Sequence, residues 1–128
     1  PRIFYVNWFR KDENGTFLWP GFGDNLRVLK WILDRCEGRG GSVETAIGAV
    51  PTLDAIDRTG LAVSDADMVQ LLKVDPAEWV EAIEGQEELM KMFGDRMPEP
   101  LRGEHEDLAR RIKAAVTPPD LVGREGGE

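Results

Sequence analysis

The sequence predicts a mainly helical α+β chain, in which an N-terminal β-hairpin with an aromatic hinge is followed by four to five helices. Three observations lead to this class. Residues 2–10 are rich in β-branched and aromatic types, and helical periodicity with capping signals begins near Asp24. Hydrophobic residues make up 41% of the 128 residues, which is enough for one small packed domain.

The hairpin is predicted over residues 2–19. Residues 2–10 (RIFYVNWFR) carry large apolar side chains on both faces of a strand, so we expect both faces to be covered. Residues 12–15 (DENG) are a turn signal, and residues 16–19 form a short return strand that ends before Pro20. Because a lone hairpin is at best marginally stable, we expect the rest of its sheet to come from outside this chain.

The hinge is Gly21–Phe22–Gly23, where two glycines flank one aromatic ring. Asp24 then predicts the start of a helix that runs to about Cys36. The apolar stripe of this helix is formed by Leu26, Leu29, Ile32, Leu33 and Cys36. Residues 1–37 therefore form one region, made of the hairpin, an aromatic loop and the first helix. A loop rich in glycine and small residues is expected over residues 38–51.

A helical region is predicted over residues 52–117. Thr52 caps a short helix through Ile56, and Ser64 with Asp67 resembles the capping box of a helix that ends at Leu72. An aspartate followed by proline at residues 75–76 predicts a helix that ends near Gly94. A last helix is expected over about 100–116. The remaining residues, 118–128, have no apolar face and are expected to be disordered.

Charge and cysteine content exclude several classes of function. A net charge of −8 argues against binding to a polyphosphate backbone, so no nucleic-acid partner is expected. The single cysteine, Cys36, excludes an internal disulfide and suits a reducing cytosol. No apolar run approaches the roughly 18 residues of a membrane helix, and no signal peptide is evident. The chain begins at Pro1 directly in a strand-like pattern, which suggests a fragment of a longer protein.

The usual catalytic and metal-binding motifs are absent: the sequence contains no GxxxxGK[ST], HExxH, CxxC or GxSxG. His105 lies in the run GEHED, where a solvated helix start is favoured over a metal cluster. Residues 38–42 (GRGGS) are favoured as a plain linker over a phosphate cradle, and Cys36 as a small core residue over a nucleophile. A solvated helix face explains Glu81, Glu84, Glu87 and Glu88. We therefore expect no catalytic residue and no metal ligand in this chain.

The aromatic stretch at residues 7–25 is compatible with a site for a planar ligand. Phe9 and Phe17 flank the predicted turn, and the corner at residues 20–21 can fold Phe22 over them. Rings held about 7 Å apart accept a flat heterocycle between them, and stacking a base contributes roughly 1–3 kcal/mol. Asn25 supplies an amide donor and acceptor for the edge of a base. An ordinary aromatic mini-core is the simpler alternative on composition and spacing alone.

The same residues resemble a known family. The run NWFRKD at residues 7–12, Gly15, the run FLWPGFG at residues 17–23 and Asn25 closely resemble GTP-dependent phosphoenolpyruvate carboxykinases near their C-terminus. The resemblance is strong over residues 1 to about 58 and continues by pattern through the helical remainder, with Glu78–Trp79 as its best landmark. It implies that this chain is the C-terminal portion of the α/β carboxykinase fold.

The resemblance also implies a function. The parent enzyme, a lyase of gluconeogenesis, converts oxaloacetate and GTP into phosphoenolpyruvate, GDP and carbon dioxide, as a cytosolic monomer with Mn²⁺ and Mg²⁺. Phe9 and Phe22 would sandwich the guanine, Phe17 would pack edge-on, and Asn25 would recognise the guanine edge. The metal ligands, the phosphate-binding loop and the oxaloacetate-binding residues lie upstream in the family, so we expect this chain alone to be catalytically inactive.

A second hypothesis comes from a different class. The chain could be a small helical interaction module whose aromatic hairpin docks a protein partner. A nucleotide pocket binds GDP and discriminates against ADP, whereas a docking surface responds to neither, so nucleotide binding separates the two hypotheses.

Overall fold

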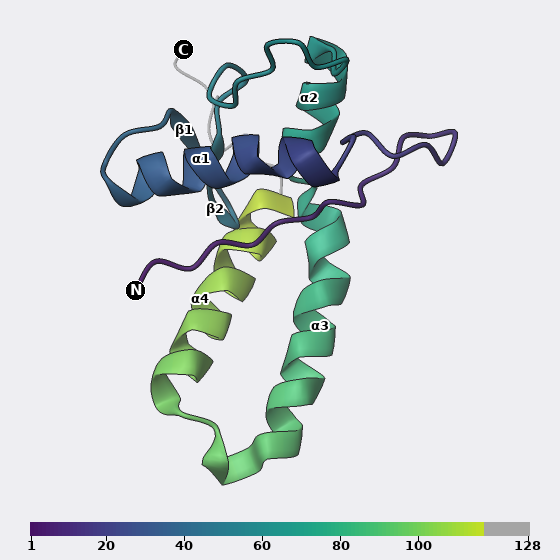
Figure 1. Ribbon diagram of the computed structural model, residues 1–128. Helices are drawn as coiled ribbons and strands as arrows, with labels where there is room; N and C mark the ends of the chain where they lie inside the picture. Colours follow the sequence, from purple (N-terminus) through teal and green to yellow (C-terminus); the bar gives the residue numbers. More distant parts are fainter. Residues whose placement is uncertain (117–128) are drawn as a thin grey trace, which may run out of the picture. The chain divides into compact units, whose positions relative to one another are not determined.

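The computed structural model describes residues 1–116. The chain divides into two units, and the boundary in the sequence follows Lys73. The first, residues 1–73, contains α1 (Asn25–Cys36), β1 (Ser42–Thr45), β2 (Gly48–Pro51) and α2 (Asp65–Leu72). The second contains α3 (Pro76–Phe93) and α4 (Glu99–Val116) (Figure 1). The prediction of a mainly helical α+β chain is confirmed. The predicted disordered tail lies outside the described residues.

The N-terminal hairpin is much smaller than predicted. Residues 2–10 form no strand, and the only ladder contact near the predicted turn is one antiparallel bridge between Lys11 and Phe17. The turn itself is present, because the backbone N–H groups of Asp12 and Gly15 donate to the carbonyls of Thr16 and Asp12. The prediction of a strand was wrong because a strand requires a neighbour, and residues 1–116 provide none for this segment.

Instead of forming a strand, the first residues lie along α1. The ring of Phe4 contacts Trp31 edge-on at a centroid distance of 6.1 Å, and the Arg2 guanidinium donates to the carbonyl of Arg35 (Figure 1). Further along, the Arg10 guanidinium donates to the carbonyl of Lys73, 2.7 Å away, beyond the end of α2. These contacts attach the aromatic segment to the body of the first unit.

Helix α1 buries a different face from the one predicted. Trp31 is buried, and Val28 and Ile32 pack beside it, whereas Leu26, Leu29, Leu33 and Cys36 are exposed. The predicted stripe was therefore wrong except at Ile32, and Cys36 is not a core residue. Both faces of α1 carry apolar side chains, so local periodicity could not decide which one would be covered.

Residues 38–51 were predicted as a loop, but most of them form an antiparallel hairpin. Strands β1 and β2 pair from Ser42 opposite Pro51 to Thr45 opposite Gly48. The turn is stabilised by the Thr45 hydroxyl, which donates to the Gly48 carbonyl at 2.6 Å, and Gly48 has a φ of 118°. This φ strongly favours glycine. The strands were not predicted because the residues around Gly48 are small and their composition is typical of a loop.

The core of the first unit gathers residues from distant parts of its sequence. Trp19, Trp31, Ile56, Val63 and Met68 are buried together. Helix α2 contributes Met68 and starts at the predicted capping box, in which Ser64 and Asp67 each accept a hydrogen bond from the other's backbone N–H. The short helix predicted over residues 52–56 is absent; this segment forms a turn closed by the N–H of Ala55 and the carbonyl of Thr52.

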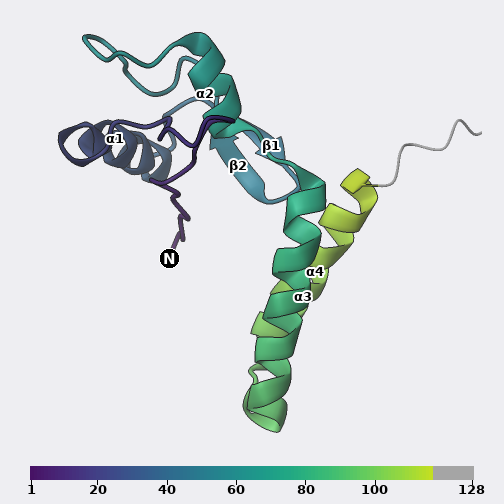
Figure 2. The same ribbon diagram turned by 90° about the vertical axis from the view of Figure 1, so that its right-hand side faces the viewer.

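The second unit is an antiparallel pair of helices (Figures 1 and 2). As predicted, Asp75 caps α3 by accepting from the N–H of Ala77 at 3.0 Å, and Pro76 occupies the first turn. A 3₁₀ turn at Gly94–Arg96 ends α3, and α4 follows close to its predicted bounds. The capping signal thus located α3 correctly, and the expected bounds of α4 are close to those in the structure.

Candidate functional site

The turn at residues 12–16 brings Phe9 and Phe17 together. Its backbone is held by the Asp12 carboxylate, which accepts from the N–H groups of Asn14 and Thr16 at 2.9 Å each. Across the turn, the Phe9 and Phe17 rings meet edge-on, with centroids 6.1 Å apart and planes inclined by 63°. Both side chains are largely exposed, so the pair presents aromatic surface outward and does not fill a core.

A cation covers part of this aromatic pair. The ammonium group of Lys11 lies 4.9 Å from the centroid of the Phe17 ring. An ammonium over a ring face is attracted by the electrons of the ring, which orients Phe17 and places positive charge beside the exposed aromatic surface. The immediate surroundings of the pair therefore differ from the net acidic character of the whole chain.

Phe22 has an unusual backbone and a free ring. Its φ is 37°, in the left-handed region, and the preceding Gly21 has a φ of 84°. A bulky residue in this region costs about 1–3 kcal/mol. The Phe22 side chain is 97% exposed and makes no ring contact with residues 1–116. The structure thus brings Phe9 and Phe17 together, whereas the ring of Phe22 is exposed and available for stacking against another aromatic group.

The fourth predicted residue, Asn25, is the first residue of α1 and is half-buried. Its side-chain oxygen accepts a hydrogen bond of 2.9 Å from the indole Nε1 of Trp19. Trp19 was not among the predicted site residues. The signal was available, because a buried indole N–H almost always requires an acceptor and Asn25 is the first carboxamide after Trp19.

Arg27 fixes the chain around the start of α1. Its guanidinium donates to the carbonyls of Asp57 and Thr59 at 2.9 Å each and pairs with the Asp24 carboxylate at 3.1 Å. Hydrogen bonds from the Thr59 hydroxyl and backbone N–H lower the pKa of Asp57 below its usual value. A loop distant in sequence is thereby attached to the helix turn that carries Asn25. This role of Arg27 was not predicted, because its two carbonyl partners are 30 and 32 residues away in the sequence.

Comparison with known proteins identifies the family. A family model described as "Phosphoenolpyruvate carboxykinase C-terminal P-loop domain" matches residues 1–111. The chain belongs to this family.

Three relatives named phosphoenolpyruvate carboxykinase [GTP] illustrate the similarity. The chain is 47% identical over 112 residues to the protein of Paenarthrobacter aurescens strain TC1, with 88% of this chain and 18% of the relative covered. It is 48% identical over 117 residues to that of Neocallimastix frontalis (91% and 19% covered). It is 50% identical over 116 residues to that of Treponema pallidum strain Nichols (90% and 19% covered). The chain thus spans less than a fifth of the length of these carboxykinases.

The described part of this carboxykinase segment does not provide a metal site. Residues 1–116 contain no group of three or more His, Cys, Asp or Glu side chains that could hold a metal ion. Glu81, Glu84, Glu87 and Glu88 are exposed on α3, as predicted.

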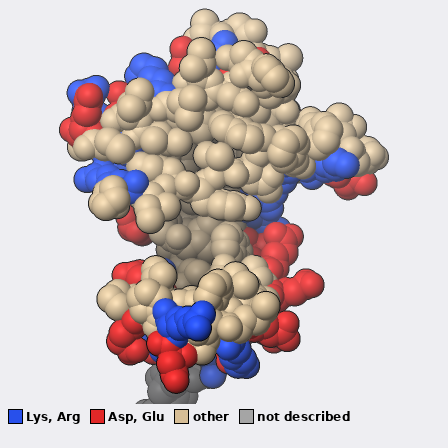
Figure 3. All heavy atoms as spheres, turned by 60° about the horizontal axis from the view of Figure 1, so that its bottom comes forward, with Lys and Arg blue, Asp and Glu red and all other residues tan. Residues whose placement is uncertain are grey.

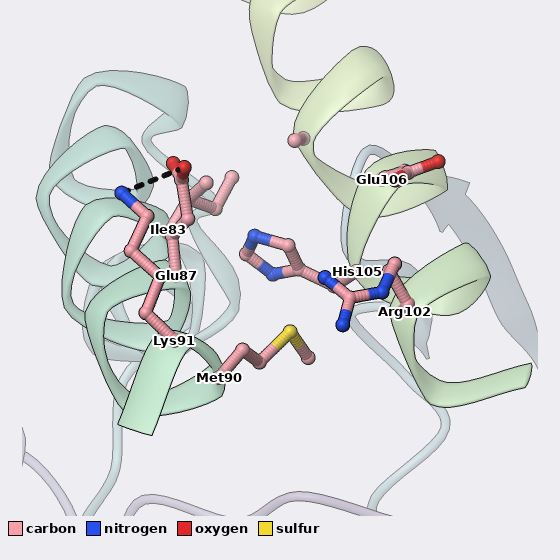
Figure 4. A pocket seen from close by; sticks show the side chains of 8 residues that line it. Ile83, Glu87, Met90, Lys91, Arg102, His105 and Glu106 are labelled. Carbon is pink, nitrogen blue, oxygen red and sulfur yellow. Dashed lines mark ion pairs between the residues drawn. The ribbon is translucent and has the colours of Figure 1, made fainter. Parts of the chain in front are cut away.

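His105 instead lines a pocket of about 300 Å³ between α3 and α4. Its Nδ1 lies 3.3 Å from the side-chain oxygen of Gln86. Figure 4 shows its ring directed between the two helices, with the ion pair of Glu87 and Lys91 (3.1 Å) on the side of α3. Arg102 and Glu106 add opposite charges on α4. Positive and negative groups line this pocket together, so it does not select one sign of ligand.

On the face in Figure 3, basic side chains lie beside acidic ones. Among residues 1–116, no helix has both the length and the apolar character required to cross a membrane.

Proposed function

We propose that this chain is the guanine-nucleotide-recognition part of a GTP-dependent phosphoenolpyruvate carboxykinase. The enzyme would convert oxaloacetate and GTP into phosphoenolpyruvate, GDP and carbon dioxide, a decarboxylation with phosphoryl transfer that serves gluconeogenesis. The observation that carries the proposal is the exposed ring pair of Phe9 and Phe17, in a chain of this family whose Asn25 carboxamide is oriented by Trp19. The enzyme would act as a monomer in the cytosol, where the free thiol of Cys36 remains reduced.

Guanine would bind by stacking and by hydrogen bonding at its edge. Phe9 and Phe22 would enclose the base, and Phe17, which already meets Phe9 edge-on, would support it from the side. The exposure of the Phe22 ring supports this arrangement, because a bound base would cover apolar surface that is open to water. Guanine has an acceptor at the 6-position and a donor at N1, whereas adenine has a donor at the 6-position and an acceptor at N1. Asn25 would distinguish the two bases by this difference.

The reaction chemistry would come from the remainder of the enzyme. The relatives are more than five times as long as the segment that matches them, which leaves ample sequence for a phosphate-binding loop, for oxaloacetate binding and for ligands of Mn²⁺ and Mg²⁺. These ions would neutralise charge on the transferred phosphoryl group. We accordingly propose that the chain alone is inactive, and a pure preparation that decarboxylates oxaloacetate with GTP would contradict this.

The remainder of the enzyme would also cover apolar surface in the first unit. Ile3 and Tyr5 are exposed in the N-terminal segment, as are Leu26, Leu29 and Leu33 on α1. Apolar side chains gathered in this way mark interaction surfaces. A sheet neighbour supplied by the remaining sequence would allow residues 2–10 to form the strand that their composition predicts.

Nucleotide binding tests the proposal. GDP and ADP are titrated against this chain and against the complete enzyme that carries it, with tryptophan fluorescence as the signal, because Trp8 and Trp19 are close in sequence to Phe9 and Asn25. Saturable quenching by GDP and not by ADP is expected in the complete enzyme. If GDP also quenches the fluorescence of the chain alone, the site is contained in these residues. If neither nucleotide affects the complete enzyme, the proposed function is wrong and the docking-module hypothesis is favoured.

Matched variants assign the binding to the ring pair. Phe17→Ala should weaken GDP binding by about 5- to 150-fold, the equivalent of one lost stacking interaction. Phe93→Ala is the control, because Phe93 is 52% exposed on α3 and Phe17 is 54% exposed in the site. Equal effects of the two substitutions would remove Phe17 from the proposed site.

A further inference from the structure

Trp19 connects the candidate site to the core of the first unit. Its side chain is 5% exposed and packs with Trp31, Ile56, Val63 and Met68. The Nε1 of its indole reaches out of this cluster and donates to the Oδ1 of Asn25 at 2.9 Å. The only side-chain hydrogen bond of Asn25 within residues 1–116 is therefore made to a group that the core holds in place.

The chemistry of this bond determines which way the carboxamide faces. An indole N–H only donates, so the group facing it must be the carboxamide oxygen and not the amide nitrogen. The nitrogen, with its two donors, is consequently directed away from Trp19. It has no partner among the described residues, and Asn25 retains contact with solvent at the start of α1.

We propose that Trp19 is a positioning residue that determines base specificity through Asn25. By holding Oδ1, it presents the Nδ2 donor to the ligand and selects purines with an acceptor oxygen at the 6-position, such as guanine and hypoxanthine. Adenine carries a 6-amino donor, which would face another donor. This inference rests on the proposed function, because it requires that a purine occupy the site beside Asn25.

The carboxamide would lose this selectivity without the indole N–H. Its oxygen and nitrogen ends are nearly identical in size, so an unrestrained side chain can turn over and offer Oδ1 to the amino group of adenine. With Trp19 present, the turned-over form would place two donors together and leave a buried indole N–H unpaired. Removal of the indole N–H should therefore improve the use of adenine nucleotides and weaken the use of guanine nucleotides.

A second buried tryptophan provides a matched control. Trp31 is 6% exposed in the same cluster, and its Nε1 donates at 2.9 Å to a backbone carbonyl, that of Gly41. Trp19→Phe and Trp31→Phe thus each remove one indole N–H bond of the same length from one core. Only the first of these bonds involves Asn25.

The experiment compares kcat/KM for GTP, ITP and ATP in the complete enzyme that carries this chain. Trp19→Phe should lower both the GTP/ATP and the ITP/ATP ratio by about tenfold, and Trp31→Phe should leave both ratios unchanged. In an Asn25→Ala background, Trp19→Phe should cause no further loss of selectivity, because the effect acts through the missing carboxamide. Replacement of Trp19 by 3-benzothienylalanine, which keeps the shape and lacks the N–H, provides the same test if Trp19→Phe does not fold.

The outcomes separate the inference from the proposed function. If the unmodified enzyme prefers GTP and the folded Trp19 variants keep this preference, Trp19 has only a structural role and the inference is wrong. Equal loss of selectivity in Trp19→Phe and Trp31→Phe would also overturn the inference, because it would trace the loss to the core as a whole. If the unmodified enzyme does not distinguish GTP from ATP, the proposed function itself fails, and the inference fails with it.

Discussion

Substitution of Arg27 by alanine should destabilise the first unit by loosening the loop at residues 57–60. Arg27 is the side chain that joins this loop to the start of α1, through bonds of 2.9 Å to the carbonyls of Asp57 and Thr59. It is 25% exposed, so part of its bonding is protected from water, and it also pairs with Asp24 at 3.1 Å.

The magnitude follows from these contacts. A hydrogen bond from a charged donor contributes about 1.5–3 kcal/mol when it is well protected. Asp57 and Thr59 are exposed, so their carbonyls can bind water after the substitution, and we reduce the estimate to roughly 0.5–1 kcal/mol for each bond. The partly exposed pair with Asp24 adds about 0.3 kcal/mol. The expected loss for Arg27→Ala is therefore about 1–2 kcal/mol.

Urea unfolding followed by tryptophan fluorescence measures this loss, because Trp8, Trp19 and Trp31 all lie in the first unit. Arg27→Lys should recover about half of the stability, since an ammonium group cannot span both carbonyls as the guanidinium does. Arg39→Ala is the control. Arg39 is 65% exposed and, within residues 1–116, its side chain pairs only with Asp34 and Glu37, so its loss should change stability by less than about 0.5 kcal/mol.

Two results would refute this reasoning. If Arg27→Ala is no more destabilising than Arg39→Ala, the two carbonyl bonds contribute nothing in solution. If Arg27→Lys is as stable as the unmodified protein, charge alone accounts for the effect and the forked geometry of the guanidinium does not matter.

Three further predictions concern the same unit. Met68→Ala should lower the unfolding free energy by about 2–5 kcal/mol, because this side chain is 1% exposed in the core; a urea midpoint no lower than that of the unmodified protein would show that the core does not depend on it. Gly41→Ala should lower the thermal midpoint, since an added Cβ would lie 2.6 Å from the Thr52 hydroxyl oxygen, and an unchanged midpoint in calorimetry would mean that Thr52 turns away freely. Hydrogen bonds from the Ser64 backbone N–H and then its hydroxyl lower the pKa of Asp67, so its stabilising effect is complete above about pH 4 and is lost as the pH falls further. Thermal midpoints of Asp67→Asn and the unmodified protein should therefore differ at pH 6 and converge near pH 2.5. A difference that does not change with pH would show that the lowered pKa of Asp67 does not contribute to stability.

Local signals in the sequence predicted the helices well, apart from the short helix expected over residues 52–56. The capping box at Ser64 and Asp67 and the cap at Asp75 involve residues two or three positions apart, so their geometry depends little on the rest of the chain. The turn at residues 12–15 is equally local. Each of these features was predicted from a few neighbouring residues and is present in the structure.

Features that require a partner strand or tertiary packing were not predictable in the same way. The composition of residues 2–10 favours a strand, but a strand forms only against another strand, and residues 1–116 supply none. Strands β1 and β2 are short and rich in small residues, and they become evident only through their pairing with each other. The exposed and buried faces of α1 were interchanged because both carry apolar residues and only tertiary packing selects between them.

The candidate site shows the same division. Phe9, Phe17, Phe22 and Asn25 were chosen from the sequence alone, because aromatic rings, glycines and a carboxamide at this spacing are compatible with a planar ligand and resemble one family. Only the tertiary structure showed how Asn25 is oriented, through an indole N–H held in the core, and how Arg27 attaches a distant loop to the same turn. The sequence determined which chemical groups are present, since composition and short-range geometry are local properties. Their orientation depends on packing between residues far apart in the chain, and that was decided by the fold.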